Sequence, residues 1–149
     1  EKIPYTDTDG TPRIRYEINW DKALNFDGET GPYVQYTHAR CCSVVRKAAE
    51  VNLPEPDWSA LTDDEAQSLL RLMGRFPDVI REAADKYEPS MITRAVTDIA
   101  QAFNKYYYEH RILDGEADQA AARVAMTKAV ATLIRTGLFL VGIEAPERM

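Results

Sequence analysis

Both cysteines of the chain and one of its two histidines fall in one stretch, GPYVQYTHARCC, at residues 31–42. Cys41 and Cys42 follow His38 by three and four residues, so on a helix an imidazole and a thiol would share a face. Such a pair can work as general base and nucleophile. No third group that could orient the imidazole lies nearby, and cysteine is among the most buried residue types. The pattern favours packed cysteines, with a small cysteine hydrolase as an alternative.

The sequence offers little for a metal or phosphate site. A structural zinc site needs about four ligands, usually with CxxC-type spacing, which His38, His110 and two adjacent cysteines do not supply. Neighbouring side chains on a helix point about 100° apart, which predicts a reduced thiol pair rather than a disulfide. The phosphate-binding patterns GxGxxG and GxxxxGK[ST] are absent from the sequence. We therefore predict no metal site and no self-contained active site.

A second unusual stretch, NKYYYEHR, spans residues 104–111. Three consecutive tyrosines spread over roughly 200° of a helix surface, so they cannot all face a core. Tyr106 continues an apolar stripe, which predicts that Tyr107 or Tyr108 is partly exposed. Arg111 follows Tyr107 by four residues, on the same side of a helix. An exposed aromatic ring beside an arginine is typical of surfaces that stack unpaired RNA bases, although half-buried tyrosines are also common.

The elements that would position these residues are mostly helical. The first helix is predicted from Pro32 to about residue 50. A second follows a TDDE capping box at residues 62–65, and a third begins at the FP pair, residues 76–77, and ends at about residue 87. Two longer helices are predicted at about 90–112 and 117–135. Gly137 is the expected C-cap of the last helix. The short apolar LFLVGI, residues 138–143, fits a last helical turn or a buried strand, and we expect the helical turn. These segments predict an all-α bundle of about five helices.

The first thirty residues differ from the rest. RIRYEINW, residues 13–20, alternates apolar and polar side chains, with Ile14, Tyr16, Ile18 and Trp20 on one side. This pattern predicts a half-buried strand, as one arm of a hairpin. The fold class is thus an all-α bundle with a short irregular, β-like N-terminal extension.

Composition limits the possible partners. The net charge is −6, which argues against nonspecific binding to DNA or RNA, since phosphate contacts need clustered basic residues. Residues 33–49 nevertheless contain Arg40, Arg46 and Lys47 and no acid, so a local basic face is possible. No apolar run approaches the roughly 20 residues that span a bilayer, and no membrane partner is expected.

Three blocks of the sequence resemble the C-terminal part of bacterial-type arginyl-tRNA synthetases. They are GPYVQYTHAR, the long stretch FPDVIREAADKYEPSMITRAVTDIAQAFNKYYYEHRIL, and the final RTGLFLVGIEAPERM. WDKALNFDGETGPYVQYTHAR resembles the join between the catalytic domain and the helical, DALR-type anticodon-binding domain. The resemblance implies a tail of the catalytic domain at residues 1–31 and an anticodon-binding domain at residues 32–149.

The resemblance also implies roles for individual residues. The tRNA-binding positions would be Asn104, Tyr106, Tyr107, Arg111, Arg148 and Met149. The domain junction would be held by Gln35, Tyr36, His38 and Arg40, of which His38 and Arg40 could instead face tRNA. The chain end, Arg148 and Met149, would help to shape the anticodon pocket.

The resemblance also implies that catalysis and anticodon binding belong to different domains. The family's enzymes use ATP and Mg to ligate arginine to tRNA in a Rossmann catalytic domain with HIGH and KMSKS-like signatures, and this sequence contains neither. We therefore expect a cytoplasmic C-terminal fragment that holds no cofactor, does not catalyse the reaction, and has arginine tRNA and its own catalytic domain as partners. The alternative is a helical protein–protein interaction module that shares the fold.

Overall fold

The computed structural model describes residues 2–17, 20 and 30–149. Its elements are the strands β1 (Lys2–Thr6) and β2 (Pro12–Tyr16), the helices α2 (Gly31–Ala48), α3 (Asp64–Asp85), α4 (Ser90–Glu109) and α5 (Ala117–Leu140), and the 3-10 turn η1 (Trp58–Ala60). The chain divides into two compact units, Glu1–Tyr33 and Val34–Met149. The division predicted at residues 31 and 32, as the join to another domain, stays a prediction.

The first unit contains a two-stranded antiparallel hairpin in which Lys2 pairs with Tyr16 and Thr6 with Pro12. This confirms the predicted hairpin arm only as far as Tyr16, where β2 ends. The described residues Glu17 and Trp20 are not part of the strand, and Ile18 lies outside the described residues. The expectation of half-burial is not met within this chain, because Ile14 is 55% exposed. A lone two-stranded sheet has no second layer against which it could bury one face.

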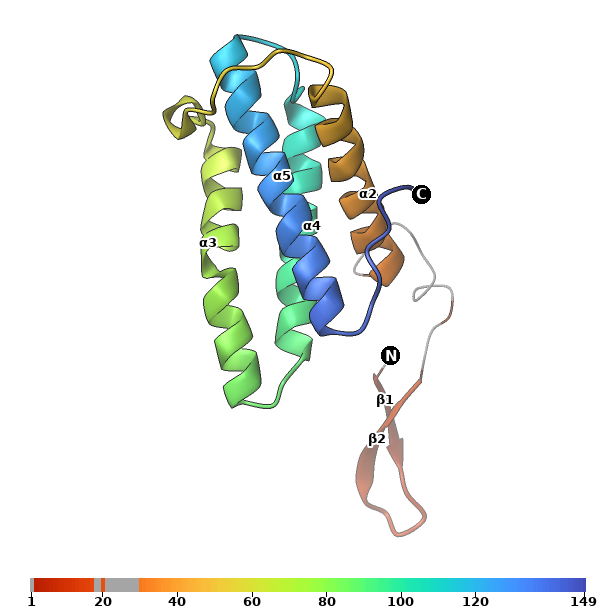
Figure 1. Ribbon diagram of the computed structural model, residues 1–149. Helices are drawn as coiled ribbons and strands as arrows, with labels where there is room; N and C mark the ends of the chain where they lie inside the picture. The colour runs from red at the N-terminus through yellow and green to blue at the C-terminus, as the bar shows by residue number, and fades with distance from the viewer. Residues whose placement is uncertain (1, 18–19, 21–29) are drawn as a thin grey trace. The chain divides into compact units, whose positions relative to one another are not determined.

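The second unit is a helical bundle (Figure 1). Helix α4 packs against α3 and α5, and hydrogen bonds from Asn104 and Arg40 join α4 to α2. The apolar stripe predicted along α4 is buried as expected; it consists of Ile92, Val96, Ile99, Phe103 and Tyr106. The mainly α-helical class is confirmed.

The expected count of five helices is wrong, because residues 64–85 form one helix with Pro77 inside it. Proline removes one hydrogen bond from a helix interior and usually bends or ends it. Here Leu69, Phe76 and Ala83 recur every seven residues and are all buried. Their common face packs against the bundle on both sides of Pro77, and this packing keeps the helix continuous.

Two predicted caps are also wrong. Helix α3 has Asp63 rather than Thr62 at its N-cap, and no side chain caps it, because the helix begins one residue later than a TDDE box requires. Helix α5 continues through Gly137, where an added Cβ would lie 2.1 Å from Val96 Cγ1. The absence of a side chain at Gly137 therefore lets α5 approach α4 closely. The helix extends to Leu140, over the first part of LFLVGI.

Gly142 ends α5 instead. It has a φ of +75°, and hydrogen bonds run from its N–H to the Phe139 carbonyl and from the Ile143 N–H to the Leu138 carbonyl. This is the Schellman arrangement, which favours glycine at the left-handed position. Among the described residues, no helix is both long and apolar enough to cross a membrane.

Candidate nucleic-acid interface

A groove of about 1030 Å³ opens on the second unit, between α2, the end of α4, the α4–α5 loop and the last residues of the chain. It brings together most of the residues that the sequence singled out: Tyr36, Arg40, Asn104, Tyr107, Arg111, Arg148 and Met149. These residues come from four segments that are far apart in the sequence. Tyr106, Gln35 and His38 do not line it.

Arg40 of α2 lines this groove and contacts α4. Its guanidinium carbon is 4.9 Å from the centre of the Tyr36 ring and 5.2 Å from that of Tyr107. It donates a hydrogen bond of 2.5 Å to Asn104 Oδ1, and Asn104 Nδ2 donates in turn to Thr37 Oγ1 at 2.8 Å. Cation–π contacts and the fixed amide hold the guanidinium plane between the two tyrosines, which forms a continuous aromatic and cationic surface across α2 and α4.

The lining of the groove is basic although the chain is acidic. Five basic side chains and two acidic ones contribute to it: Arg40, Arg46, Lys47, Arg111, Arg148, Asp114 and Glu147. The whole chain has a net charge of −6. A local excess of arginine and lysine beside exposed rings is the arrangement that attracts a single-stranded nucleic-acid backbone and stacks its bases.

Tyr107 and Tyr108 provide the exposed rings of the second unusual stretch. They are 38% and 92% exposed, which confirms that the three tyrosines do not share one environment. Helix α4 ends at Glu109, so Arg111 does not follow Tyr107 on a helix face as predicted. The loop after the helix still brings Arg111 to the groove, where its side chain is 89% exposed and lies 3.3 Å from Asp114.

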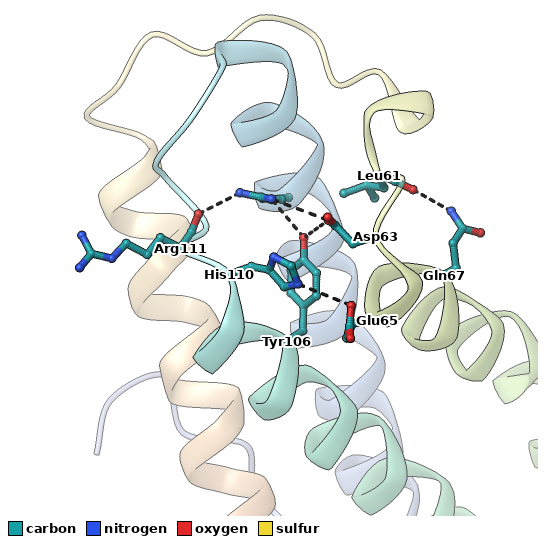
Figure 2. A network of polar contacts seen from close by, with 8 residues as sticks. Leu61, Asp63, Glu65, Gln67, Tyr106, His110 and Arg111 are labelled. Atoms are coloured by element: carbon teal, nitrogen blue, oxygen red, sulfur yellow. Dashed lines mark hydrogen bonds and ion pairs between the residues drawn. The ribbon is translucent and has the colours of Figure 1, made fainter.

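Tyr106 has a different environment from its neighbours, because it is fully buried. Its hydroxyl accepts a hydrogen bond from Arg123 Nε at 3.1 Å and faces Asp63 Oδ2 at 3.4 Å (Figure 2). Burial raises the pKa of Tyr106, an effect that the charge of Arg123 opposes. In this structure the Tyr106 ring cannot stack on a base, and its hydroxyl joins α4 to α5 and to the start of α3.

Arg123 is the residue of this network that the sequence reasoning missed. Arg123 as a whole is 8% exposed, and its guanidinium donates to the Arg111 carbonyl at 3.2 Å and lies 3.7 Å from Asp63. A buried arginine is rare unless its charge is paired. The available signal was a lone arginine within the alanine-rich start of α5, AAARVAM.

A histidine–carboxylate cluster lies beside this network. His110 Nε2 is 3.7 Å from Glu65 Oε2, and the His110 ring packs 4.5 Å from that of Tyr106. Ligand atoms of Glu65, Glu109 and His110 lie within 4.8 Å of one another. A closed structural zinc site uses about four ligands, whereas this cluster offers three, one of them exposed. Figure 2 shows the His110 ring directed at Glu65.

Gln35 and His38, predicted to hold a domain junction, both contact the C-terminal segment. Gln35 Nε2 donates to the Glu144 carbonyl at 2.8 Å, and His38 Nδ1 lies 2.9 Å from the Pro146 carbonyl. Since a carbonyl only accepts, the His38 proton is on Nδ1. Contacts of these residues with another domain stay a prediction.

The two cysteines are both free. Cys41 is completely buried, and burial raises the pKa of its thiol far above the ordinary value. Cys42 Sγ lies 3.7 Å from His38 Nε2, but burial first and Glu147 second raise its thiol pKa as well. Only a thiolate is a good nucleophile, so this geometry disfavours the cysteine hydrolase.

Comparison with known proteins gives a consistent result. The sequence pattern of the family described as "DALR anticodon binding domain" matches residues 34–149. The chain is 46% identical over 134 residues to the arginine–tRNA ligase of Halothermothrix orenii, covering 90% of this chain and 24% of that protein. It is 45% identical over 134 residues to the arginine–tRNA ligase of Clostridioides difficile, with the same two coverages.

A solved structure agrees with these matches. The arginyl-tRNA synthetase of Thermus thermophilus superimposes with a TM-score of 0.77 at 32% identity, over 85% of this chain and 22% of that one. The chain spans about a quarter of the length of the relatives it matches. The helical bundle with its basic, tyrosine-rich groove is thus a domain of the helical class that this family describes. The chain belongs to the DALR anticodon-binding domain family.

Proposed function

We propose that this chain is the anticodon-binding module of an arginyl-tRNA synthetase, and that its groove receives the anticodon loop of arginine tRNA. The observation that carries the proposal is the convergence of Tyr107, Arg40 and Arg111 with the chain end at one basic groove. The two relatives are arginine–tRNA ligases, which supports arginine as the amino acid of the parent enzyme.

The groove suggests how an unpaired loop would bind. The exposed face of Tyr107 offers a surface on which a splayed base can stack, worth about 1–3 kcal/mol per base. Arg40 is held by Asn104 and by two rings, so its guanidinium is oriented before RNA arrives. Arg111 and Arg148 are exposed and would contact phosphates or base edges, although Arg111 also pairs with Asp114. Tyr108 is a second candidate for stacking.

In this proposal the module binds tRNA and does not catalyse. Activation of arginine with ATP and Mg²⁺ would belong to the catalytic domain of the same enzyme, which would be the module's second partner. The module would hold no cofactor of its own, and the whole enzyme would work in the cytoplasm. The hairpin at residues 2–16 would belong to the part of the chain that contacts the catalytic domain.

The test is a salt titration of the chain against an arginine tRNA transcript, beside the same transcript with its anticodon replaced. We expect the native anticodon to be preferred by about 1 kcal/mol or more and the affinity to fall with salt. Equal affinity for both transcripts, or no binding at any salt concentration, would refute the proposal.

Matched variants inside and outside the groove test whether the groove itself binds the RNA. Tyr107→Ala should weaken binding by about 1–3 kcal/mol, whereas Tyr87→Ala, a 93% exposed tyrosine outside the groove, should not. Arg111→Ala should reduce the slope of log affinity against log salt by about 0.7, the value for one phosphate of a single strand. Arg94→Ala, an exposed arginine of α4 outside the groove, is the control for that slope.

A further inference from the structure

The last residues of the chain are held against α2 rather than projecting from the bundle. After the glycine turn at Gly142 the chain reverses and runs back alongside α2 (Figure 1). Ala145 and Pro146 are half-buried there, whereas residues 147–149 are exposed. The final three residues nevertheless line the groove, so something before them must fix their direction.

Two side chains of α2 provide that fixation. Gln35 Nε2 donates to the Glu144 carbonyl at 2.8 Å and His38 Nδ1 to the Pro146 carbonyl at 2.9 Å. The donors are three residues apart and share a helix face. The acceptors are the carbonyls of two residues of the tail, Glu144 and Pro146. Two donors on one helix face therefore hold two carbonyls of the tail, and together they form a two-point attachment.

We infer that Gln35 and His38 are positioning residues for RNA binding, which act by holding the tail so that Arg148 and Met149 form a wall of the groove. This inference rests on the proposed function for the identity of the ligand. Both donors bind backbone carbonyls, so the attachment does not depend on the tail's side chains. His38 is 3% exposed and lies outside the groove, and its effect on RNA would pass through the tail.

The chemistry of His38 offers a precise set of variants. Asparagine places its amide nitrogen where histidine has Nδ1, so His38→Asn keeps the donor to Pro146. His38→Ala removes the donor. Gln35→Glu keeps the shape of that side chain but replaces the donor with a carboxylate, which the Glu144 carbonyl would repel.

The experiment measures two quantities on the 149-residue chain. The first is the backbone ¹⁵N order parameter of Arg148 and Met149, which reports how firmly the tail is held. The second is the affinity for an arginine tRNA transcript, measured for each variant in the full chain and in a chain that lacks residues 147–149. The signal of the fully buried Met126 methyl group verifies that each variant is folded.

We expect lower order parameters at Arg148 and Met149 in His38→Ala and Gln35→Glu, and wild-type values in His38→Asn. Affinity should fall by about two- to tenfold in the first two variants, the factor for one lost hydrogen bond, and recover in His38→Asn. In the chain without residues 147–149 the same substitutions should have no further effect, because the wall they position is already missing.

Two results would overturn the inference. One is an unchanged tail in both His38→Ala and Gln35→Glu. The other is a loss of affinity that is equally large in the chain without residues 147–149, since this would place the two residues in direct contact with RNA or in general stability. If the unmodified chain binds neither transcript, the proposed function fails, whereas the positioning role is still decided by the order parameters.

Discussion

Replacing Tyr106 by phenylalanine separates the folding role of this tyrosine from the binding role predicted for it. The substitution removes one oxygen atom from a fully buried ring and keeps the packing. The lost oxygen accepts from Arg123 Nε at 3.1 Å and faces Asp63 at 3.4 Å. Hydrogen bonds to charged groups contribute about 1.5–3 kcal/mol, and a buried donor left without a partner costs a similar amount.

The remaining charges reduce this loss. Arg123 still donates to the Arg111 carbonyl and still lies 3.7 Å from Asp63, so the guanidinium keeps two of its partners. We therefore expect Tyr106→Phe to lower the free energy of unfolding by about 1–3 kcal/mol. Urea unfolding followed by circular dichroism measures this as a lower midpoint with an unchanged slope.

Tyr107→Phe is the matched control, since it removes the same atom from a partly exposed ring of the same helix. Its effect on the free energy of unfolding should lie within about 0.5 kcal/mol. The affinity of folded Tyr106→Phe for an arginine tRNA transcript should stay within twofold of the unmodified chain. A Tyr106→Phe chain with the original urea midpoint and a tenfold weaker affinity would refute this assignment and return Tyr106 to the RNA-binding surface.

Three further predictions concern stability and the thiols. Gly137→Ala should destabilise the chain by about 1–3 kcal/mol in urea, because its Cβ would meet Val96 Cγ1 at 2.1 Å; an unchanged midpoint would show that α4 and α5 can separate at no cost. Tyr87→Gly should raise the free energy of unfolding by about 0.5–1 kcal/mol, because Tyr87 has a φ of 55° and is 93% exposed; a lower melting temperature would contradict this. Native Cys41 and Cys42 should react with iodoacetamide more slowly than free cysteine at pH 8, since burial raises both thiol pKa values above the ordinary 9.0, and both should react after unfolding in guanidinium. Equal reaction rates in the native and unfolded chain would show that the thiols are not protected. Because the folded-state pKa values are raised, the contribution of the thiols to the free energy of unfolding is complete below pH 9.0 and declines above it.

Local patterns in the sequence were sufficient to identify which segments are helical. The stripe from Ile92 to Tyr106 has helical spacing and is buried throughout, because a helix of this length can be stabilised only by packing an apolar face. The same geometry separates Tyr106 from Tyr107 and Tyr108, since adjacent helical positions point about 100° apart. The family resemblance likewise needed only the order of sequence blocks.

Where each helix ends, and whether two helical segments form one helix, depended on contacts across the bundle. Pro77 is a helix breaker by local rules, yet α3 passes through it because Leu69 and Phe76 pack on one core face. Gly137 resembles a C-cap, yet it lies inside α5 because Val96 leaves no room for a side chain there. Both outcomes are decided by neighbours that the local sequence does not contain.

The same distinction holds for the groove. The sequence by itself determined that the tyrosines after Asn104 have unequal exposure and that α2 carries a basic stretch. Only the tertiary structure decided that Arg40 of α2 lies between Tyr36 and Tyr107, and that Gln35 and His38 reach the backbone of the chain end. Helical periodicity specifies which face a residue occupies, whereas the partner of that face depends on how loops and side-chain packing bring distant segments together.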